Sequence, residues 1–384
     1  MVQFAFCNPT EIRFGKGQIA SITELIGADE RILLLYGGGS IMRNGVYDQV
    51  MTALSGRQVD EFGGVEANPH YETLQEASKR ARAKGSTFVL GVGGGSVIDA
   101  SKFLASMIAT GEDDPWDILV ANPDVVKPLP NGAILTLPAT GSESNPVSVI
   151  SSVRRRLKIP FANQAARPRF AIMDPQTMQS LNRRQLENGA IDAFTHVLEQ
   201  YLTVPANTPI QYGFSETVLE VLIEWGPKLV ETRSEEACEN VMWAANQALN
   251  GLIGAGVPQD WSTHMIGHAI TALYDVDHAR TLSMIMPSVF RYKLDAKVAM
   301  LARYARRVWK VDTTDDRRAA ELAIARTEEF MALMGCPIRI SDEGGLGIDA
   351  EAIVEHLEKA GHTGLGEAGD IRPDDVRQIL AMAC

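Results

Sequence analysis

The chain has few cysteines, and their spacing suits neither a disulfide framework nor a thiolate metal site. Cys7, Cys238, Cys336 and Cys384 lie far apart in 384 residues, and no two of them form a Cys-x-x-Cys pair. Widely separated cysteines are typical of proteins that remain in a reducing compartment. We therefore expect a cytoplasmic protein whose stability comes from its apolar cores.

Basic charge and long apolar segments are also scarce. The chain carries 36 Lys and Arg against 48 Asp and Glu, for a net charge of -12, which argues against general binding to nucleic acid or to anionic membranes. No apolar run reaches the roughly 18 residues of a membrane span. The first residues also lack the basic start and apolar stretch of a signal peptide. We expect small-molecule partners, with no nucleic acid and no membrane.

The first half of the chain alternates apolar strands with helical segments. RILLLY (31–36) precedes a helical pattern over 41–54, and STFVLGV (86–92) precedes another over 97–109. Nearly continuous apolar strands between helices indicate a parallel sheet that is buried on both faces. Residues 1–180 are therefore predicted to form a Rossmann-like α/β domain.

Strand signals become rare after Asp174, and the remaining patterns are mostly helical. We place the boundary near 178–182, with an all-α domain over 181–384. The chain has no low-complexity segment and no linker rich in Pro, Gly or Ser, so a ligand cleft between two rigidly packed domains is the expectation.

Two copies of Gly-Gly-Gly-Ser end apolar strands, at Gly37 to Ser40 and at Gly93 to Ser96. Neither copy matches G-x-G-x-x-G, and a tight turn from strand to helix is the alternative explanation. However, the second copy ends a strand and opens a helix, where free amides and the helix dipole favour an anion. A third strand ends in LTLPATGSESNP (135–146), which is rich in hydroxyl groups. Because the ends of parallel strands meet at one sheet edge, we expect the three loops to converge on one nucleotide.

The first glycine loop bears on the choice of nucleotide. NAD-specific sites usually place an acid after the second strand to hold the ribose 2′-hydroxyl. Here no acid occurs between Gly37 and Asp48, which favours NADP, although a protein that binds no nucleotide would also lack this acid.

The helical half contains a polar set within NGAIDAFTHVLEQY. Asp192, His196 and Glu199 fall within one narrow arc of a helix, opposite apolar residues that include Ile191 and Phe194. The alternative explanation for this arc is a polar face exposed to solvent.

Three of the seven histidines follow within fifteen residues. His264 and His268 are one helical turn apart, and His278 comes ten residues later after an acidic loop. The first pair resembles H-E-x-x-H, but Met265 replaces the general base of a metalloprotease. One aspartate and several histidines suit a divalent-metal site with nitrogen and oxygen ligands. Ordinary core or capping histidines are the alternative.

Taken together, FGKG (14–17), GGGSVID (93–99), PATGSES (138–144) and the Asp/His set resemble the iron-containing alcohol dehydrogenase family along essentially the whole chain. The similarity is greatest to its NADPH-dependent aldehyde reductase and butanol dehydrogenase branch. It implies a dehydroquinate synthase-like architecture, in which 1–180 binds the dinucleotide and 181–384 binds metal and substrate. It also implies a homodimer.

The resemblance further implies specific site residues. The ligands of one divalent ion, Zn(II) or Fe(II), would be Asp192, His196, His264 and His278, with His268 as a catalytic neighbour that delivers a proton. The residues that would contact NADP(H) are Gly38, Gly39, Ser40, Asn68, Gly94, Gly95, Ser96, Asp99, Thr136, Thr140, Ser142, Asn145 and Lys158. The neighbouring arginines, 154 to 156, are expected to form a solvated loop.

The expected reaction is the reversible reduction of short-to-medium aldehydes to primary alcohols. One alternative is a metal- and NAD-dependent lyase of the dehydroquinate synthase type, which would need several basic residues beside the metal for a phosphorylated substrate. Next to the ligands in sequence we find only Arg280. The other alternative is a non-catalytic nucleotide sensor, which would need no metal ligands.

Overall fold

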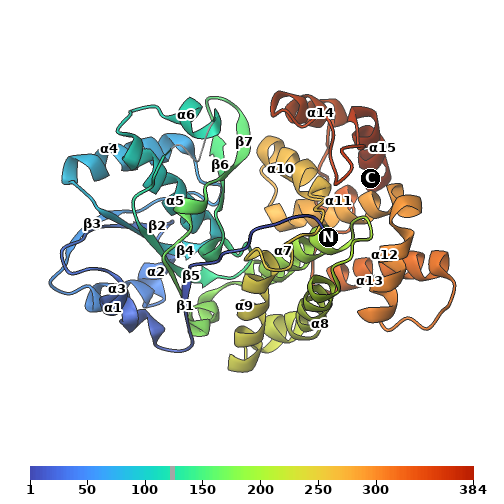
Figure 1. Ribbon diagram of the computed structural model, residues 1–384, viewed down its shortest axis with the longest axis horizontal. Helices are drawn as coiled ribbons and strands as arrows, with labels where there is room; N and C mark the ends of the chain where they lie inside the picture. Colours follow the sequence, from blue (N-terminus) through green and yellow to red (C-terminus); the bar gives the residue numbers. More distant parts are fainter. Residues whose placement is uncertain (122–125) are drawn as a thin grey trace. The chain divides into compact units, whose positions relative to one another are not determined.

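The computed structural model describes residues 1–121 and 126–384, and it divides them into two compact units (Figure 1). One unit is Cys7–Leu181, and the other joins Met1–Phe6 to Asn182–Cys384. The sequence prediction had placed residues 1–6 with the α/β domain. They belong instead to the helical unit, where the Val2 amide donates to the Gly256 carbonyl at 3.0 Å.

Cys7–Leu181 is built on a six-stranded sheet in which all neighbouring strands are parallel. Its order is β1-β8-β5-β4-β2-β3. The strands are β1 (Glu11–Phe14), β2 (Arg31–Tyr36), β3 (Gln58–Phe62), β4 (Phe88–Gly94), β5 (Asn131–Leu137) and β8 (Phe170–Met173). The predicted parallel α/β architecture is therefore confirmed for this half of the chain.

Side chains of β2 alternate between two cores, as the pleat of a strand requires. Leu33 and Leu35 join the core on one face, whereas Ile32 and Leu34 join the core on the other. The first core also contains residues of α4 (Tyr71–Lys84) and α5 (Gly95–Thr110). The second contains residues of η1 (Gln18–Ser21), α1 (Ile22–Leu25), α2 (Ser40–Arg43) and α3 (Val46–Ala53). Burial on both faces explains why these strands are almost wholly apolar.

The helix expected over 41–54 is interrupted. The structure has α2 and α3 in its place, separated by Asn44 and Gly45, and Gly45 has a φ of 78°. Glycine adopts this left-handed conformation without steric cost, and it ends one helical segment before the next begins.

A small antiparallel sheet was not predicted from the sequence. It pairs β6 (Val147–Ser152) with β7 (Leu157–Ala162), and the arginine-containing turn lies between them. The remaining short elements of this unit are α6 (Trp116–Ala121), η3 (Ser142–Ser144), η4 (Gln164–Ala166) and η5 (Pro175–Ser180).

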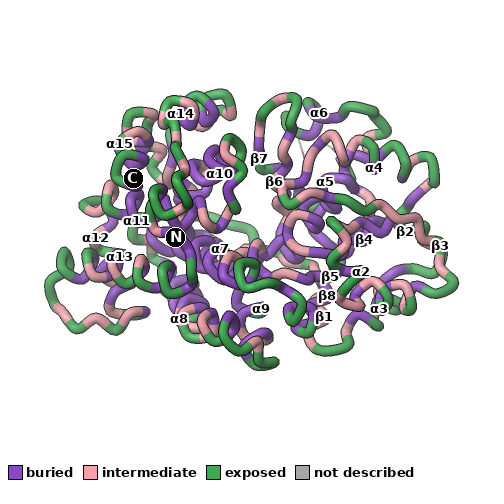
Figure 2. Tube along the Cα trace, turned by 180° about the vertical axis from the view of Figure 1, so that it is seen from behind, coloured by how far each residue is buried: buried purple, intermediate pink, exposed green. Residues whose placement is uncertain are grey.

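Helices make up the second unit, in agreement with the sequence. They are α7 (Arg183–Tyr201), α8 (Pro209–Thr232), α9 (Glu235–Leu249), α10 (Ser262–Tyr274), α11 (His278–Tyr292), α12 (Leu294–Arg307), α13 (Asp316–Leu333), α14 (Ala350–Lys359), α15 (Pro373–Ala383) and the short η6 (Ile340–Asp342). Helices α7 and α11 are buried along most of their length, as the purple trace in Figure 2 shows. Within the described ranges, no helix has the length and apolar character needed to cross a membrane.

Candidate metal centre and cofactor loops

Helix α7 carries two of the expected metal ligands on one face. Asn182 begins the helix with a capping box, in which it accepts a bond from the Gln185 amide while the Gln185 side chain accepts one from the Asn182 amide. The helix then places Asp192 and His196 one turn apart, with 3.7 Å between Asp192 Oδ1 and His196 Nε2.

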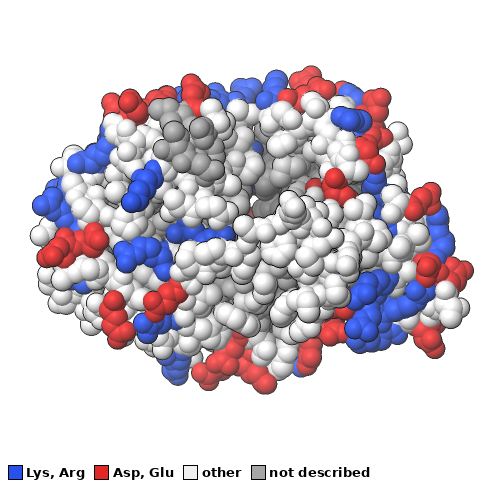
Figure 3. Space-filling view, viewed as in Figure 1, with Lys and Arg blue, Asp and Glu red and all other residues white. Residues whose placement is uncertain are grey.

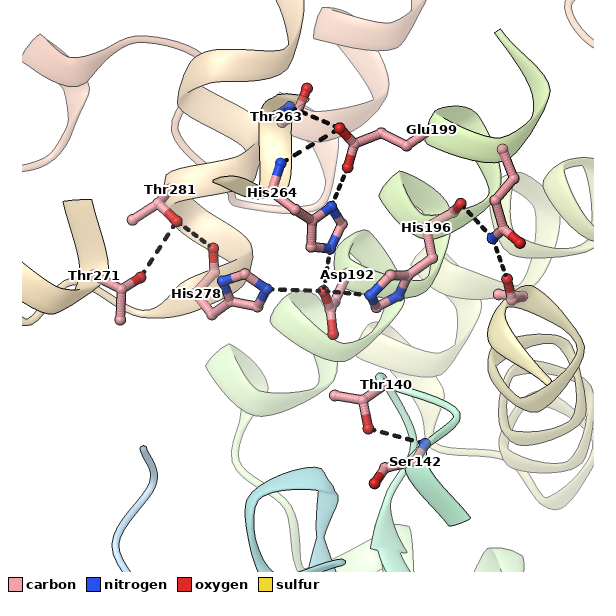
Figure 4. A network of polar contacts seen from close by, with 12 residues as sticks. Thr140, Ser142, Asp192, His196, Glu199, Thr263, His264, Thr271, His278 and Thr281 are labelled. Carbon is pink, nitrogen blue, oxygen red and sulfur yellow. Dashed lines mark hydrogen bonds and ion pairs between the residues drawn. The ribbon is translucent and has the colours of Figure 1, made fainter. Parts of the chain in front are cut away.

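Two further helices bring imidazoles to the same carboxylate oxygen (Figure 4). Nε2 of His264, in the first turn of α10, lies 3.9 Å from Asp192 Oδ1. Nε2 of His278, the first residue of α11, lies 3.8 Å from it. All four side chains expected from the sequence to bind the metal therefore converge on one point.

The donor set fits a divalent ion. Tetrahedral zinc sites have bonds of about 2.0–2.2 Å to nitrogen and oxygen, so their ligand atoms lie about 3.3–3.6 Å apart. The separations at Asp192 Oδ1 are only a few tenths of an ångström longer. Asp192, His196 and His264 also form a buried group whose ligand atoms lie within 4.8 Å of one another. One carboxylate and three neutral imidazoles would leave a net positive charge around a divalent ion.

His268 stands beside this centre on the next turn of α10. Its ring centroid is 4.7 Å from that of His278 and 5.9 Å from that of His264. His268 is 9% exposed, so it is a buried imidazole next to the ligands, outside the three-residue group that the structure assembles around Asp192.

The polar face of α7 is not exposed to solvent, so that alternative explanation was wrong. Asp192, His196 and Glu199 are all less than 5% exposed. A further polar residue, Gln200, donates to the carbonyls of His196 and Ala248 at 2.8 and 2.9 Å, and thereby ties α7 to α9. Buried polar groups need such partners, because unpaired ones lose their hydration without compensation.

Glu199 has a partner that could not be inferred from the sequence. Its carboxylate contacts His264 Nδ1 and accepts the amide hydrogens of Thr263 and His264 at 2.7 and 3.4 Å. Burial raises the pKa of Glu199 well above its usual value and the nearby charge of Asp260 raises it further, whereas the two backbone bonds lower it. In the sequence, the helical spacing placed Glu199 on the same face as Asp192 and His196, and this spacing was the one indication that Glu199 belongs to the site.

Basic side chains near the centre are already neutralised by ion pairs. Arg280 contacts Glu343 at 2.6 Å. Arg184 contacts Asp277 at 2.5 Å and Glu343 at 3.3 Å. Neither guanidinium is therefore left to bind the phosphate of a substrate.

In the α/β unit, the two glycine loops follow neighbouring strands. Gly38, Gly39 and Ser40 come after β2, and Gly94, Gly95 and Ser96 come at the junction of β4 and α5. The chain order reverses between these two strands, and this is where open α/β sheets bind their ligands. Gly95 is required sterically, because a Cβ there would lie 2.5 Å from Thr140 Oγ1.

Several expected cofactor residues bond to one another. Asp99 accepts from Ser142 Oγ at 2.5 Å and from the Val149 amide at 2.8 Å. Asn145 Oδ1 accepts from the Val147 amide at 3.0 Å. Thr140 Oγ1 accepts from the Ser142 amide at 3.2 Å, while Thr136 is buried in β5. These bonds hold the loop after β5 against the first turns of α5.

Lys102 also belongs to this network, and the sequence analysis did not predict a role for it. It is fully buried in α5, and its Nζ lies 3.6 Å from Asp99 and donates to the carbonyls of Ser142 and Asn145 at 2.9 and 3.2 Å. Burial lowers the pKa of Lys102 to about 8, although Asp99 counteracts this effect. The sequence around a buried lysine gives no sign of which distant carbonyls its side chain will meet.

The remaining two expected residues meet directly. Lys158 Nζ in β7 donates to Asn68 Oδ1 at 2.9 Å. The preceding turn is only partly the solvated loop that the sequence predicted, because Arg155 is half-buried over Trp116, with Cζ 4.9 Å from the ring centroid. Arg154 and Arg156 are exposed.

The chain thus combines a parallel α/β unit with a helical unit that holds a buried Asp/His centre fit for a divalent ion. Residues 9–175 match the family described as iron-containing alcohol dehydrogenase, and residues 187–384 match the C-terminal part of the Fe-containing alcohol dehydrogenase family. The chain therefore belongs to the iron-containing alcohol dehydrogenase family.

Similarity to individual relatives and solved structures supports this assignment. The chain is 47% identical over 386 residues to the NADPH-dependent aldehyde reductase YqhD of Escherichia coli, with 100% of both chains covered. It is 37% identical to a probable NADH-dependent butanol dehydrogenase of Bacillus subtilis, with 99% of each covered. The crystal structure of E. coli YqhD matches with a TM-score of 0.97, at 47% identity, covering 100% of this chain and 99% of that one. NADH-dependent butanol dehydrogenase A of Thermotoga maritima matches with a TM-score of 0.94, at 33% identity, covering 100% and 99%.

Proposed function

We propose that this protein is an NADPH-dependent aldehyde reductase that converts short-to-medium aldehydes to primary alcohols and also catalyses the reverse reaction. The observation that carries the proposal is the convergence of three imidazole Nε2 atoms within 3.7–3.9 Å of Asp192 Oδ1. The full-length identity of 47% to an NADPH-dependent aldehyde reductase supports it.

Asp192, His196, His264 and His278 would hold one Zn(II) or Fe(II) ion, for which nitrogen and oxygen ligands suit both metals. When bound, the ion supplies a Lewis acid for the aldehyde oxygen and NADPH supplies the hydride. Because the four side chains contribute only one negative charge, the centre with a divalent ion would keep a net positive charge, which would favour the negative charge that grows on oxygen during reduction.

His268 would deliver the proton that completes the alcohol. Its ring lies beside His278 and His264, and an imidazole can exchange a proton near neutral pH. Its partial exclusion from water would limit proton exchange with bulk solvent.

The α/β unit would bind the nucleotide through the loops that follow β2, β4 and β5. Named relatives use either NADPH or NADH, so the choice depends on the residues of this chain. Gly38, Gly39 and Ser40 offer backbone groups and a hydroxyl, with no carboxylate to repel a 2′-phosphate. Lys158, beside Asn68, adds a positive charge to the same unit.

The unit Cys7–Leu181 would thus bind the dinucleotide, and the unit formed by Met1–Phe6 and Asn182–Cys384 would bind the metal and the substrate. We also propose a cytoplasmic homodimer. The four free thiols suit a reducing compartment. Large apolar side chains exposed on the helical unit, including Phe4, Ile210 and Phe214, could be covered by a second copy of the chain.

The lyase alternative has little support. Both halves of the chain match the alcohol dehydrogenase family, and Arg280 is engaged by Glu343. The deciding experiment is metal analysis of the purified protein, followed by assays of butanal with NADPH and with NADH. Protein that binds no divalent ion, or that reduces no aldehyde with either cofactor, would overturn the proposal.

A further inference from the structure

The two ring nitrogens of His264 face different carboxylates. Nε2 faces Asp192 on one side, and Nδ1 contacts Oε2 of Glu199 on the other (Figure 4). Both side chains of the second pair are buried.

We propose that Glu199 is a positioning residue that holds His264 in the Nδ1–H tautomer and aims its Nε2 lone pair at the metal. A neutral imidazole has one protonated nitrogen and one lone pair. A ligand at Nε2 therefore requires the proton to be on Nδ1, where the Glu199 carboxylate accepts it. Such a bond also makes the ring a stronger donor to the metal. The inference rests on the metal site proposed above.

Glu199 controls the backbone of His264 as well as its ring. Its Oε1 accepts the amide hydrogens of Thr263 and His264 at 2.7 and 3.4 Å. These amides belong to the first turn of α10, whose donors have no partner within the helix. A single carboxylate thus fixes both the place where α10 begins and the rotation of its first ligand ring.

The position of Glu199 in α7 makes this possible. Residues three and seven positions apart share a helix face, so Glu199 lies on the same side as His196 and Asp192. Helix α7 therefore supplies two ligands of its own and the support for a third ligand on α10. The oxygens of Glu199 are already used by Nδ1 and the two amides, so they are not available as further ligands.

A second buried residue, Asp260, fixes the backbone of Glu199. The Asp260 amide donates to the Glu199 carbonyl at 2.9 Å. The Asp260 carboxylate lies 2.7 Å from Lys297 Nζ, which also donates to Glu367 at 2.8 Å and to the Leu202 carbonyl at 2.6 Å. The loop before α10 is therefore anchored to α12 and to the C-terminal segment.

The test compares Glu199→Gln, which keeps an acceptor of the same length, with Glu199→Leu, which fills the space without one. The dissociation constant for Zn(II) is measured by competition with a chromophoric chelator. We expect about 10–100-fold weaker binding for Glu199→Leu, the range found when such supporting partners are removed, and a smaller loss for Glu199→Gln. Long-range proton–nitrogen NMR of metal-free protein should show Nδ1–H at His264 in wild type and Nε2–H in Glu199→Leu.

Glu216→Gln is the matched control. Glu216 is another buried carboxylate of the helical unit, and it bonds to Tyr201, Arg303 and Arg307, none of which is a proposed metal ligand. This variant should bind Zn(II) as wild type does and keep the His264 tautomer.

The possible outcomes separate this inference from the proposed function. Wild-type protein that binds no Zn(II) would contradict the proposed function itself. If wild type binds Zn(II) and His264→Ala does not, yet both Glu199 variants bind within twofold of wild type, the positioning role is refuted. Equal losses in Glu199→Leu and Glu216→Gln, with an unchanged tautomer, would assign Glu199 to folding alone.

Discussion

The two histidines of α10, His264 and His268, differ in how they approach Asp192. His264 directs Nε2 toward Asp192 at 3.9 Å, whereas His268 approaches the centre through ring contacts with its neighbours. Replacing the two residues should therefore have different consequences.

His264→Ala is expected to lose the bound metal and the activity together, because it removes one of the four proposed ligands. His268→Ala should retain the metal, while kcat falls by roughly 10²–10⁴-fold, the range for a positioned general acid. Metal content by elemental analysis and kcat measured on the same preparations check both expectations. Loss of metal from His268→Ala would show that the two histidines are not distinct in role.

The proposed role of the turn after β2 in cofactor choice can be tested by changing a single residue, and Gly38 is a better position to change than Gly39. A Cβ at Gly38 would meet no atom within 4 Å, whereas Gly39 has a φ of 87°, which strains other residues. Gly38→Asp should shift the ratio of kcat/KM for NADPH and NADH toward NADH, since a carboxylate holds the ribose 2′-hydroxyl and repels a 2′-phosphate.

Gly38→Asn is the control for this change, because it has the same size without the charge. Its ratio should remain closer to wild type than that of Gly38→Asp. If the aspartate variant folds and its ratio is unchanged, the turn after β2 does not contact the 2′ position.

At the scale of elements, two buried charged side chains of α5 bond to the loop after β5, Asp99 through Ser142 and Lys102 through the carbonyls of Ser142 and Asn145, and they also form an ion pair with each other. Lys102 and Asp99 lie 3.6 Å apart, with side-chain exposures of 0% and 13%. Removing one member of such a pair leaves the other charge buried without compensation.

Lys102→Met should therefore lower the free energy of unfolding of the α/β unit by about 3–5 kcal/mol. Lys79→Met, at an exposed position of α4 in the same unit, should change it by less than about 0.5 kcal/mol. Denaturant titrations followed by far-ultraviolet circular dichroism measure both. Equal stabilities of the two variants would mean that the buried pair contributes nothing net.

For the whole molecule, metal binding and stability should be linked. An ion that binds only the folded state stabilises it by RT ln(1 + [L]/Kd), about 4.1 kcal/mol at a thousand times Kd. Chelated wild type should gain this stability when Zn(II) is restored, and His264→Ala should not. Four of the five tryptophans, at positions 225, 243, 261 and 309, belong to the helical unit, so their fluorescence follows its unfolding.

Charge across the molecule bears on the substrate. Acidic and basic side chains are intermixed on the face shown in Figure 3, and Arg184 and Arg280, near the centre, are paired with acids. Uncharged unbranched aldehydes should therefore react best. Their preference should vary gradually with length, because one methylene changes binding by about 1–3 kcal/mol.

A series of kcat/KM values over aldehydes of two to eight carbons, with carboxylated and phosphorylated analogues, tests this expectation. A charged substrate that exceeds butanal by a hundredfold would contradict it and favour the lyase alternative.

The sequence alone was sufficient for features that depend on near neighbours. Apolar runs before each Gly-Gly-Gly-Ser predicted β2 and β4, and helical spacing placed Asp192, His196 and Glu199 on one face of α7. The combination of motifs indicated the alcohol dehydrogenase family, which the comparisons confirm. These features follow from periodicity and backbone preference, which act over a few residues.

Tertiary packing decided the rest. Spacing alone would pair His264 with His268, yet it is His278, from another helix, whose Nε2 faces Asp192 together with that of His264. The contact of Glu199 with His264 spans 65 positions, and that of Lys102 with Asn145 spans 43. No local pattern encodes such pairs, because the partner of a buried polar group is whichever one the packing of distant elements brings within hydrogen-bonding distance.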